Sequence, residues 1–284
     1  MKKVLIAGAA GLVIIIGLWL IVLPEDLILS RINATLKEDN LSLEIPGFEK
    51  GLFFTFHAPV LRLKRGDTVL LTIEAFTGSI NPLSLVLMRL PLSFSGNMGG
   101  GTMEGHIDLL HWHERFTISI DKTGIEQSAL LNTIGLRGRG VLSGSVIARE
   151  KYFEFKFEIR EAHFTGALYG LPVPPDLFHT VRGLIRASGN NLWIDSLWME
   201  GQGLNTRVKG TLKGRQADLT LEIMKDSSFV DSGQLLQLME HYKVSPGYYV
   251  VPLKGEMKTF PHSDWNGTSH HFLPIFTRLS LNTL

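Results

Sequence analysis

The segment Tyr152-Phe-Glu-Phe-Lys-Phe-Glu-Ile-Arg160 alternates between apolar and charged side chains along almost its whole length. Successive side chains of a β-strand point to opposite faces of a sheet, so the apolar residues after Tyr152 share one face. These residues are Phe153, Phe155, Phe157 and Ile159. A strand with one apolar and one charged face is typical of an antiparallel sheet that is buried on one side and solvated on the other.

The same alternation recurs on both sides of this segment. Residues 116–120 alternate Phe, Ile and Ile with Thr and Ser, and residues 219–223 alternate Leu, Leu and Ile with Thr and Glu. Residues 54–64 and 69–75 flank Arg65-Gly-Asp67, which predicts an antiparallel hairpin with a tight turn. The chain is therefore expected to form a sheet of many hairpin-connected strands.

Six apolar residues of these strands are the candidate lining of a hydrophobic groove or core. They are Phe153, Phe155, Phe157, Ile159, Leu219 and Leu221. Two interpretations remain open at this point. The residues form either an ordinary core beneath short helices or the wall of a groove that a lipid occupies.

A glycine motif precedes three of the alternating segments. Gly101-Thr-Met-Glu-Gly105, Gly140-Val-Leu-Ser-Gly144 and Gly210-Thr-Leu-Lys-Gly214 share the pattern Gly-x-apolar-x-Gly. Glycines inside strands mark bulges, bends or a close approach of another chain segment. The motif predicts a repeated hairpin unit in a curved meander.

Helical patterns are short and few. Residues 24–40 predict an amphipathic helix, and shorter helices are expected over Glu126–Leu136, Pro175–Val181 and Ser232–Tyr242. We expect these helices to cover the sheet. The fold class is therefore mainly β: one N-terminal transmembrane helix, then an antiparallel, Gly-rich, meandering and curved sheet with a few short covering helices.

Residues 4–23, VLIAGAAGLVIIIGLWLIVL, contain no charged residue. About 20 apolar residues in a helix span the roughly 30 Å hydrocarbon core of a bilayer. Lys2 and Lys3 precede the run, which predicts a cytoplasmic N-terminus and export of everything after residue 24. The alternative is a cleaved signal peptide, but bulky residues rather than small ones end the run. We therefore expect an uncleaved, single-pass anchor that contacts the bilayer from Val4 through Trp19 to Leu23.

Composition excludes several classes of function. The 284 residues include 28 Lys and Arg against 27 Asp and Glu, so there is no basic surplus of the kind that binds nucleic acid. The absence of Cys excludes disulfides, thiolate catalysis and cysteine-based zinc sites within the chain.

Sequence motifs for catalysis are also missing. The chain has no phosphate-binding loop, H-E-x-x-H or G-x-S-x-G sequence. His111-Trp-His113 places two imidazoles near a hairpin tip, where exposed turn residues are expected rather than a metal site. We therefore expect no catalytic residues, no cofactor, no metal and no enzymatic activity.

Several segments besides the anchor have a family-like pattern. They are Pro24-Glu-Asp-Leu27, Ile45-Pro-Gly-Phe-Glu-Lys-Gly-Leu52, Gly99–Gly105, Arg137-Gly-Arg-Gly-Val-Leu-Ser-Gly144, Trp198–Gly210 with Gly214, and Pro252-Leu-Lys-Gly255. Together they resemble the type II secretion system protein N (GspN) family. The resemblance covers roughly residues 1–255. The Gly-x-apolar-x-Gly strands also look like those of the AsmA-like superfamily of envelope proteins, and the two resemblances are compatible.

The first resemblance implies a non-catalytic, single-pass scaffold of the secretion apparatus in the bacterial inner membrane. Its periplasmic β domain is expected to contact other secretion components. The second implies a sheet that binds or conducts phospholipid along a hydrophobic groove. Either way the expected organisation is a cytoplasmic stub at 1–3, the anchor at 4–23, a periplasmic β-rich domain at 24–260 and a C-terminal tail at 261–284.

Overall fold

The computed structural model describes residues 41–51, 54–81, 84, 89, 91–108, 116–127, 136–149, 152–166, 175–214, 216–229 and 240–256. These residues form a single antiparallel sheet of 15 strands. The strands are β1 Leu41–Glu44, β2 Glu49–Lys50, β3 Thr55–Arg65, β4 Thr68–Ile80, β5 Pro91–Met98, β6 Gly101–Asp108, β7 Phe116–Gly124, β8 Leu136–Arg149, β9 Tyr152–Gly166, β10 Phe178–Ser188, β11 Asn191–Gly201, β12 Leu204–Lys213, β13 Gln216–Lys225, β14 Lys243–Ser245 and β15 Tyr248–Glu256.

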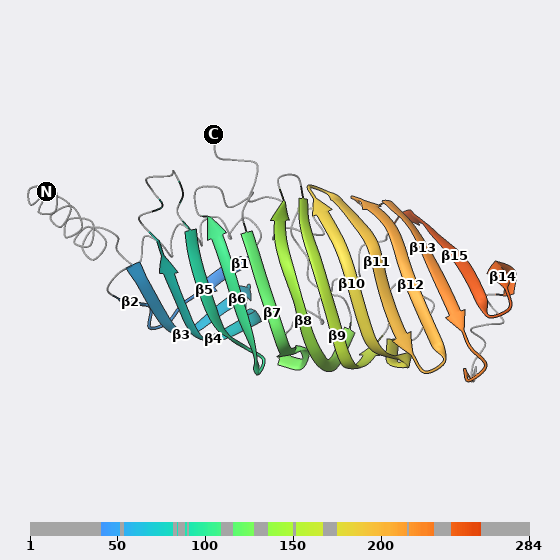
Figure 1. Cartoon of the computed structure of the whole chain (residues 1–284), viewed down its shortest axis with the longest axis horizontal. Helices are drawn as coiled ribbons and strands as arrows, with labels where there is room; N and C mark the ends of the chain where they lie inside the picture. Colours follow the sequence, from blue (N-terminus) through green and yellow to red (C-terminus); the bar gives the residue numbers. More distant parts are fainter. Residues whose placement is uncertain are drawn as a thin grey trace, which may run out of the picture.

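The strands follow one another in nearly the same order in the sheet as in the chain. The order is β1-β3-β4-β5-β6-β7-β8-β9-β10-β11-β12-β13-β15-β14, and β2 pairs with β3 beside β1. Figure 1 shows this row of strands from β2 at the left to β15 and β14 at the right, with β1 behind β5 and β6. The sheet therefore curves at its N-terminal end. The expected antiparallel meander is confirmed, including the hairpin of β3 and β4 around Gly66.

The expected helices are largely replaced by strands and short turns. No α-helix occurs in the described ranges; the 3-10 turns that lie wholly within them are Ile125–Gln127, Pro175–Leu177 and Glu240–Tyr242. The helix expected over 175–181 is wrong, because β10 begins at Phe178 and Val181 pairs with Ile159 of β9. A segment that completes the backbone hydrogen bonds of a neighbouring strand is held extended, whatever its local preference.

Other expected elements lie beyond the part of the chain that the structure describes. These are the anchor at 4–23 with Val4, Trp19 and Leu23, the helix at 24–40, most of the two helices expected near 126–136 and 232–242, and the tail at 261–284. No helix formed by the described residues is long and apolar enough to cross a membrane.

One face of the sheet is apolar across most of its strands. In antiparallel pairs, directly opposed residues lie on the same face. One such row runs through Val146, Phe155, Ile185, Ile194, Leu219 and Leu253 on β8 to β15. The adjacent row on the same face runs through Phe157, Leu197, Val208, Leu221 and Val251.

Two apolar clusters are buried on this face. The larger one extends from Ile159 of β9 to Tyr249 and Val251 of β15, and three side chains near the strand ends pack into or against it: Ile125, Leu177 and Phe229. The smaller cluster centres on Ala58, Leu61, Ile73, Phe76 and Met103, and it includes packed residues from β1 through β7. The curvature at the N-terminal end therefore places the apolar face on the inside.

Glycines on this face receive aromatic rings from the neighbouring strand. Gly78, Gly105 and Gly183 lie directly under the rings of Phe56, Phe94 and Phe157, and a Cβ at any of the three glycines would overlap the ring. The ring takes the place of the missing side chain and shields the exposed glycine backbone, an arrangement known to stabilise sheets. Of the three glycines, Gly105 belongs to a Gly-x-apolar-x-Gly motif, so that motif marks a packing site.

The three glycine motifs do not occupy equivalent places in their hairpins. Gly105 and Gly144 lie within strands, whereas Gly214 follows the last residue of β12 and adopts a φ of 57° in the turn to β13. The motif is therefore shared in sequence but serves two purposes: close packing within strands and a tight turn between them.

Bulges bend the sheet at regular intervals. Ala75, Lys122 and Glu161 have φ values of 49°, 53° and 53°, and a shift of strand register lies beside each. Residues other than glycine rarely adopt positive φ because Cβ then approaches the backbone. Three such residues inside strands indicate that the bends are imposed by the pairing on both sides.

Replacing Gly183 by Ala should destabilise the domain, because the new Cβ would collide with the Phe157 ring. Overpacking of this kind costs about 1–3 kcal/mol in unfolding free energy. Urea unfolding of wild type, Gly183→Ala, Phe157→Leu and the double variant measures the coupling between the two sites. We expect a smaller cost of Gly183→Ala when Leu replaces Phe157. An equal cost in both backgrounds would show that the ring is not responsible.

Candidate functional site

The six apolar residues expected to line a groove or core share one face and lie at different depths. Ile159 and Leu221 are buried in the larger apolar cluster, with exposed fractions of 8% and 0%. Phe157 and Leu219 are half-buried and pack against that cluster. Phe155 and Phe153 are also half-buried, one and two positions beyond Phe157 on the same face of β9. The structure brings the six together, and their burial decreases from one end of the strands to the other.

The shallow end of this face forms a half-buried apolar band across β8 to β15. Its residues are Val146, Phe153, Phe155, Ile185, Leu192, Ile194, Leu212, Leu219 and Leu253. Two small residues complete its strand-ladder rows: Gly210 lies between Ile194 and Leu219, and Ala187 lies between Phe153 and Leu192. With them the band is continuous across the sheet. A continuous, half-exposed apolar surface of this kind is suited to a long apolar ligand or to an apolar partner surface.

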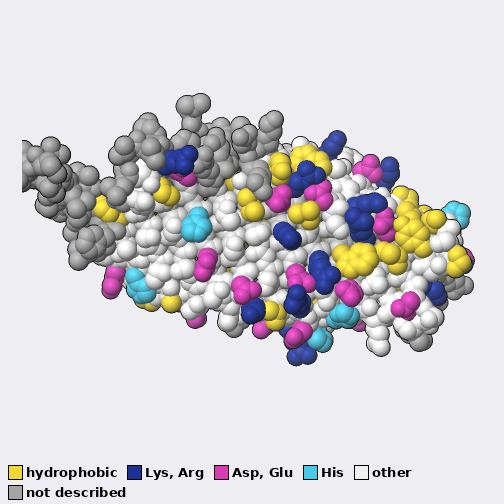
Figure 2. All heavy atoms as spheres, viewed as in Figure 1, with side chains coloured by type: hydrophobic (Ala, Val, Ile, Leu, Met, Phe, Trp, Pro, Cys, Tyr) yellow, Lys and Arg dark blue, Asp and Glu magenta, His cyan; other side chains and the backbone are white. Residues whose placement is uncertain are grey.

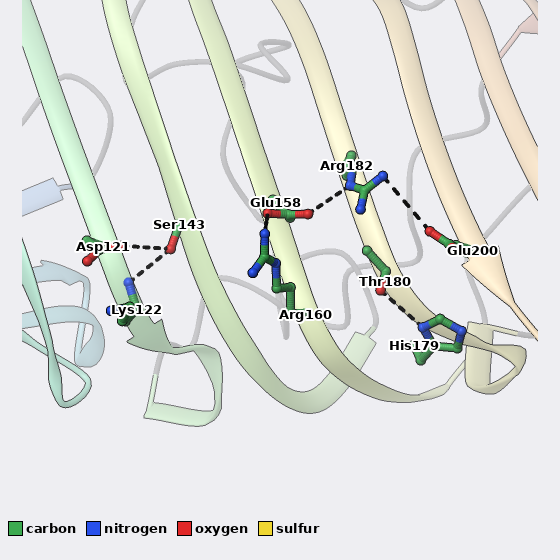
Figure 3. Close-up of polar contacts among 9 residues, drawn as sticks. All are labelled: Asp121, Lys122, Ser143, Glu158, Arg160, His179, Thr180, Arg182 and Glu200. Atoms are coloured by element: carbon green, nitrogen blue, oxygen red, sulfur yellow. Dashed lines mark hydrogen bonds and ion pairs between the residues drawn. The ribbon is translucent and has the colours of Figure 1, made fainter.

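The opposite face carries a network of ion pairs between β9, β10 and β11. Glu158 accepts hydrogen bonds from Arg160 and from Nε of Arg182, both at 2.8 Å, and Arg182 also lies 4.0 Å from Glu200. Figure 3 shows Glu158 between the two guanidinium groups. The hydrogen bond from Arg160, and then that from Arg182, holds the pKa of the Glu158 carboxyl below its ordinary value of 4.5.

A second ion pair lies on the same face near the opposite strand ends. Arg186 donates from Nε and from a terminal nitrogen to the two oxygens of Asp195, each at 2.6 Å. The guanidinium also lies over the Tyr152 ring, 5.6 Å from its centroid. A two-pronged ion pair combined with a cation–π contact fixes the orientation of the Arg186 side chain.

Two tryptophans join these arginines on the polar face. Trp193 is opposite Arg186 in the ladder and Trp198 is opposite Arg182, and both indole rings are half-buried. We call Tyr152, Arg182, Arg186, Trp193 and Trp198 the Trp–Arg patch. Figure 2 shows apolar and basic side chains gathered toward the C-terminal half of this face, whereas basic side chains are scarce over its N-terminal strands.

Sequence reasoning missed the Trp–Arg patch for a physical reason. Two residues five positions apart point to opposite faces of a regular strand, so Trp193 and Trp198 were not expected to lie together. The register shift between Ile194 and Leu197 adds a residue to β11 and returns both rings to one face. Bulges depend on pairing with both neighbouring strands, and the Leu-Trp-Ile-Asp-Ser-Leu-Trp segment carries no glycine that would have indicated one.

The described residues contain no group of three His, Cys, Asp or Glu side chains that could hold a metal ion. His111 and His113 lie outside them. The expectations of no metal, no cofactor and no enzymatic activity remain predictions.

Two prolines lie in the strands nearest the ends of the sheet. Pro59 of β3 lies in the gap between the residues that pair with β2 and those that pair with β1, and β1 itself, which ends the strand order, contains no proline. At the other end, β14 pairs only with Tyr248 and Tyr249 of β15, and Pro252 follows in the part beyond. Proline lacks the N–H that an added strand would need, so Pro252 disfavours strand addition at this part of β15.

Comparisons of the chain with protein-family models, with curated proteins and with solved structures find no match in any of the three.

The stability contributed by the Glu158 ion pairs should depend on pH. The folded-state pKa lies below the ordinary value of 4.5, so the contribution is present above that value and is lost as the pH falls through the lowered pKa. Thermal unfolding of Glu158→Gln should show a lower midpoint than wild type at pH 7, and the two should converge in acid. Glu104→Gln is the control, since Glu104 is exposed and forms no ion pair in the described part of the chain. A gap that persists unchanged in acid would contradict the assignment.

Proposed function

We propose that this chain is a non-catalytic, inner-membrane-anchored component of a bacterial type II secretion system. In this proposal residues 4–23 hold the chain in the inner membrane, and the sheet lies in the periplasm as a docking platform for other secretion components. The family-like motifs at 45–52, 99–105 and 137–144 support this assignment. The Trp–Arg patch is the structural observation that carries it.

The patch has the composition of a protein-binding hot spot. Tryptophan, tyrosine and arginine dominate the residues whose truncation weakens protein complexes most. Trp193 and Trp198 are half-buried rather than enclosed, so they retain surface that a partner would bury. Arg186 is held in place by Asp195 and Tyr152, which lowers the entropy lost when a partner binds.

Docking through a face also agrees with the structure of the C-terminal edge. Strand addition is a common way for a sheet to bind a partner, but Pro252 disfavours it on the part of β15 that β14 leaves uncovered. The partner is therefore proposed to cover the polar face of β9 to β11.

Replacing Trp193 and Trp198 by Ala should disrupt this complex while leaving the sheet folded. Truncation of a central hot-spot residue costs about 2 kcal/mol or more, equivalent to at least a 30-fold loss of affinity. The measurements are cross-linking of the full chain to inner-membrane secretion components in cells and export of folded exoproteins.

Ser119→Ala, on the same face of β7, is the matched control and should leave both readouts unchanged. Normal exoprotein secretion by a strain that lacks the whole gene would refute the assignment to the secretion system.

The half-buried apolar band favours a second candidate function, the binding or conduction of phospholipid. A band running across β8 to β15 provides a continuous path for acyl chains, and burial of each methylene contributes about 0.8 kcal/mol. This candidate concerns the face opposite the Trp–Arg patch, so the two functions do not compete for the same residues.

Phospholipid bound to the band should co-purify with the full chain and be detected by native mass spectrometry. Leu219→Asn should reduce the bound lipid, because it places an amide in the middle of the band. Thr220→Asn changes the adjacent residue on the opposite face and should retain the lipid. Retention of equal lipid by both variants, or its absence from wild type, would exclude this function.

A further inference from the structure

A second feature of the polar face lies far from the Trp–Arg patch, over β2 to β6. It is an open depression of about 630 Å³. Small hydroxyl side chains form its floor on the two central strands: Thr77 and Ser79 on β4, Ser93 and Ser95 on β5. The depression exists because these short side chains lie between longer ones on the flanking strands.

The walls of the depression carry imidazoles and carboxylates. In one cross-strand row, His57 of β3 and Glu104 of β6 lie on the two sides of Thr77 and Ser95. In the adjacent row, His106 of β6 is opposite Ser93. Glu49 of β2 extends the first row beyond His57.

The floor is preorganised by hydrogen bonds between neighbouring strands. The hydroxyl oxygens of Thr77 and Ser95 lie 3.0 Å apart, and the Ser93 hydroxyl lies 2.9 Å from Nδ1 of His106. Each hydroxyl can donate one hydrogen bond and accept two, so each retains capacity for a ligand after its bond within the protein. The side chains of His57 and Glu104 form no hydrogen bond or ion pair in the described residues.

The chemistry of this lining excludes several classes of ligand. A phosphate or sulfate would require arginine or a cluster of lysines, and the lining has two carboxylates and a single lysine, Lys50. An acyl chain or apolar peptide would require apolar side chains. Phe56 and Phe94 also line the depression, but their rings lie over Gly78 and Gly105 on the apolar face, and the floor consists of hydroxyls. A metal ion would require three or four converging ligands, which are not found together among the described residues.

A ligand rich in hydroxyl groups matches the polar groups of the lining. Sugar hydroxyls both donate and accept hydrogen bonds, as the floor does, and a carboxylate can accept from two neighbouring sugar hydroxyls. The depression crosses five strands spaced roughly 4.8 Å apart, a length suited to two or three sugar rings. We propose that it binds a short, uncharged oligosaccharide laid across the strands. This site is independent of the secretion and lipid proposals.

Titration of the full chain with N-acetylglucosamine trimer and with maltotriose tests the proposal. The protein should be held in a detergent without a sugar headgroup, because a glycoside detergent would compete for the site. We expect millimolar or tighter binding of at least one trisaccharide by calorimetry. The ring protons of His57 and His106 should shift in NMR spectra recorded during the titration.

Ser95→Trp should abolish binding by filling the depression, at least a tenfold loss. Ser145→Trp is the matched control: Ser145 lies on the same face, outside the depression, and belongs to the row that continues from Ser95 through Glu104 and Ser119. If Ser95→Trp alone lowers the thermal midpoint, Ser95→Asn and Glu104→Gln replace it and should weaken binding without removing it.

Failure of wild type to bind either sugar at millimolar concentration would overturn the proposal. Equal binding by the Ser95 and Ser145 variants would overturn it as well, because the sugar would then occupy a different surface.

Discussion

The structure depends on the pairing of β9 with β8 and β10, which holds the apolar residues of Tyr152–Gly166 on one face. This register places the Phe157 ring over Gly183. It also aligns Phe157 with the row of opposed apolar residues that ends at Val251. A register slip of one residue would turn every one of these side chains to the polar face. The Glu158–Arg182 ion pair on the other side of the same ladder reinforces the same register.

The alternation of apolar and polar residues along the strands places apolar side chains on one face of the sheet and polar side chains on the other. Apolar clusters, glycine-supported rings and the half-buried band all lie on one face, while ion pairs, tryptophans and the hydroxyl-lined depression lie on the other. Each proposed role uses a different surface. The secretion and oligosaccharide proposals use two separated parts of the polar face, and the lipid proposal uses the apolar face. A protein without recognisable catalytic motifs can serve several partners in this way.

The sheet and its apolar face were predictable from the sequence because both follow from a period of two, which Phe153 to Ile159 display without interruption. The short helix expected after Pro175 was wrong because local preference carried less weight than pairing with β9. The Trp–Arg patch depended on a bulge that leaves no mark in the sequence. The depression depended on the lateral alignment of Thr77, Ser95 and Glu104, which come from three strands, and a single sequence does not contain that alignment.

The meander gives the described sheet a length that follows from its number of strands. The strand order from β1 to β14 spans about 60 Å along its contour, since neighbouring strands lie about 4.8 Å apart. Because the strands follow chain order, each hairpin gained or lost during evolution would change this length by about 10 Å without altering the connections of the rest. The number of hairpins thus determines the length of the sheet and the distance between the surfaces at its two ends.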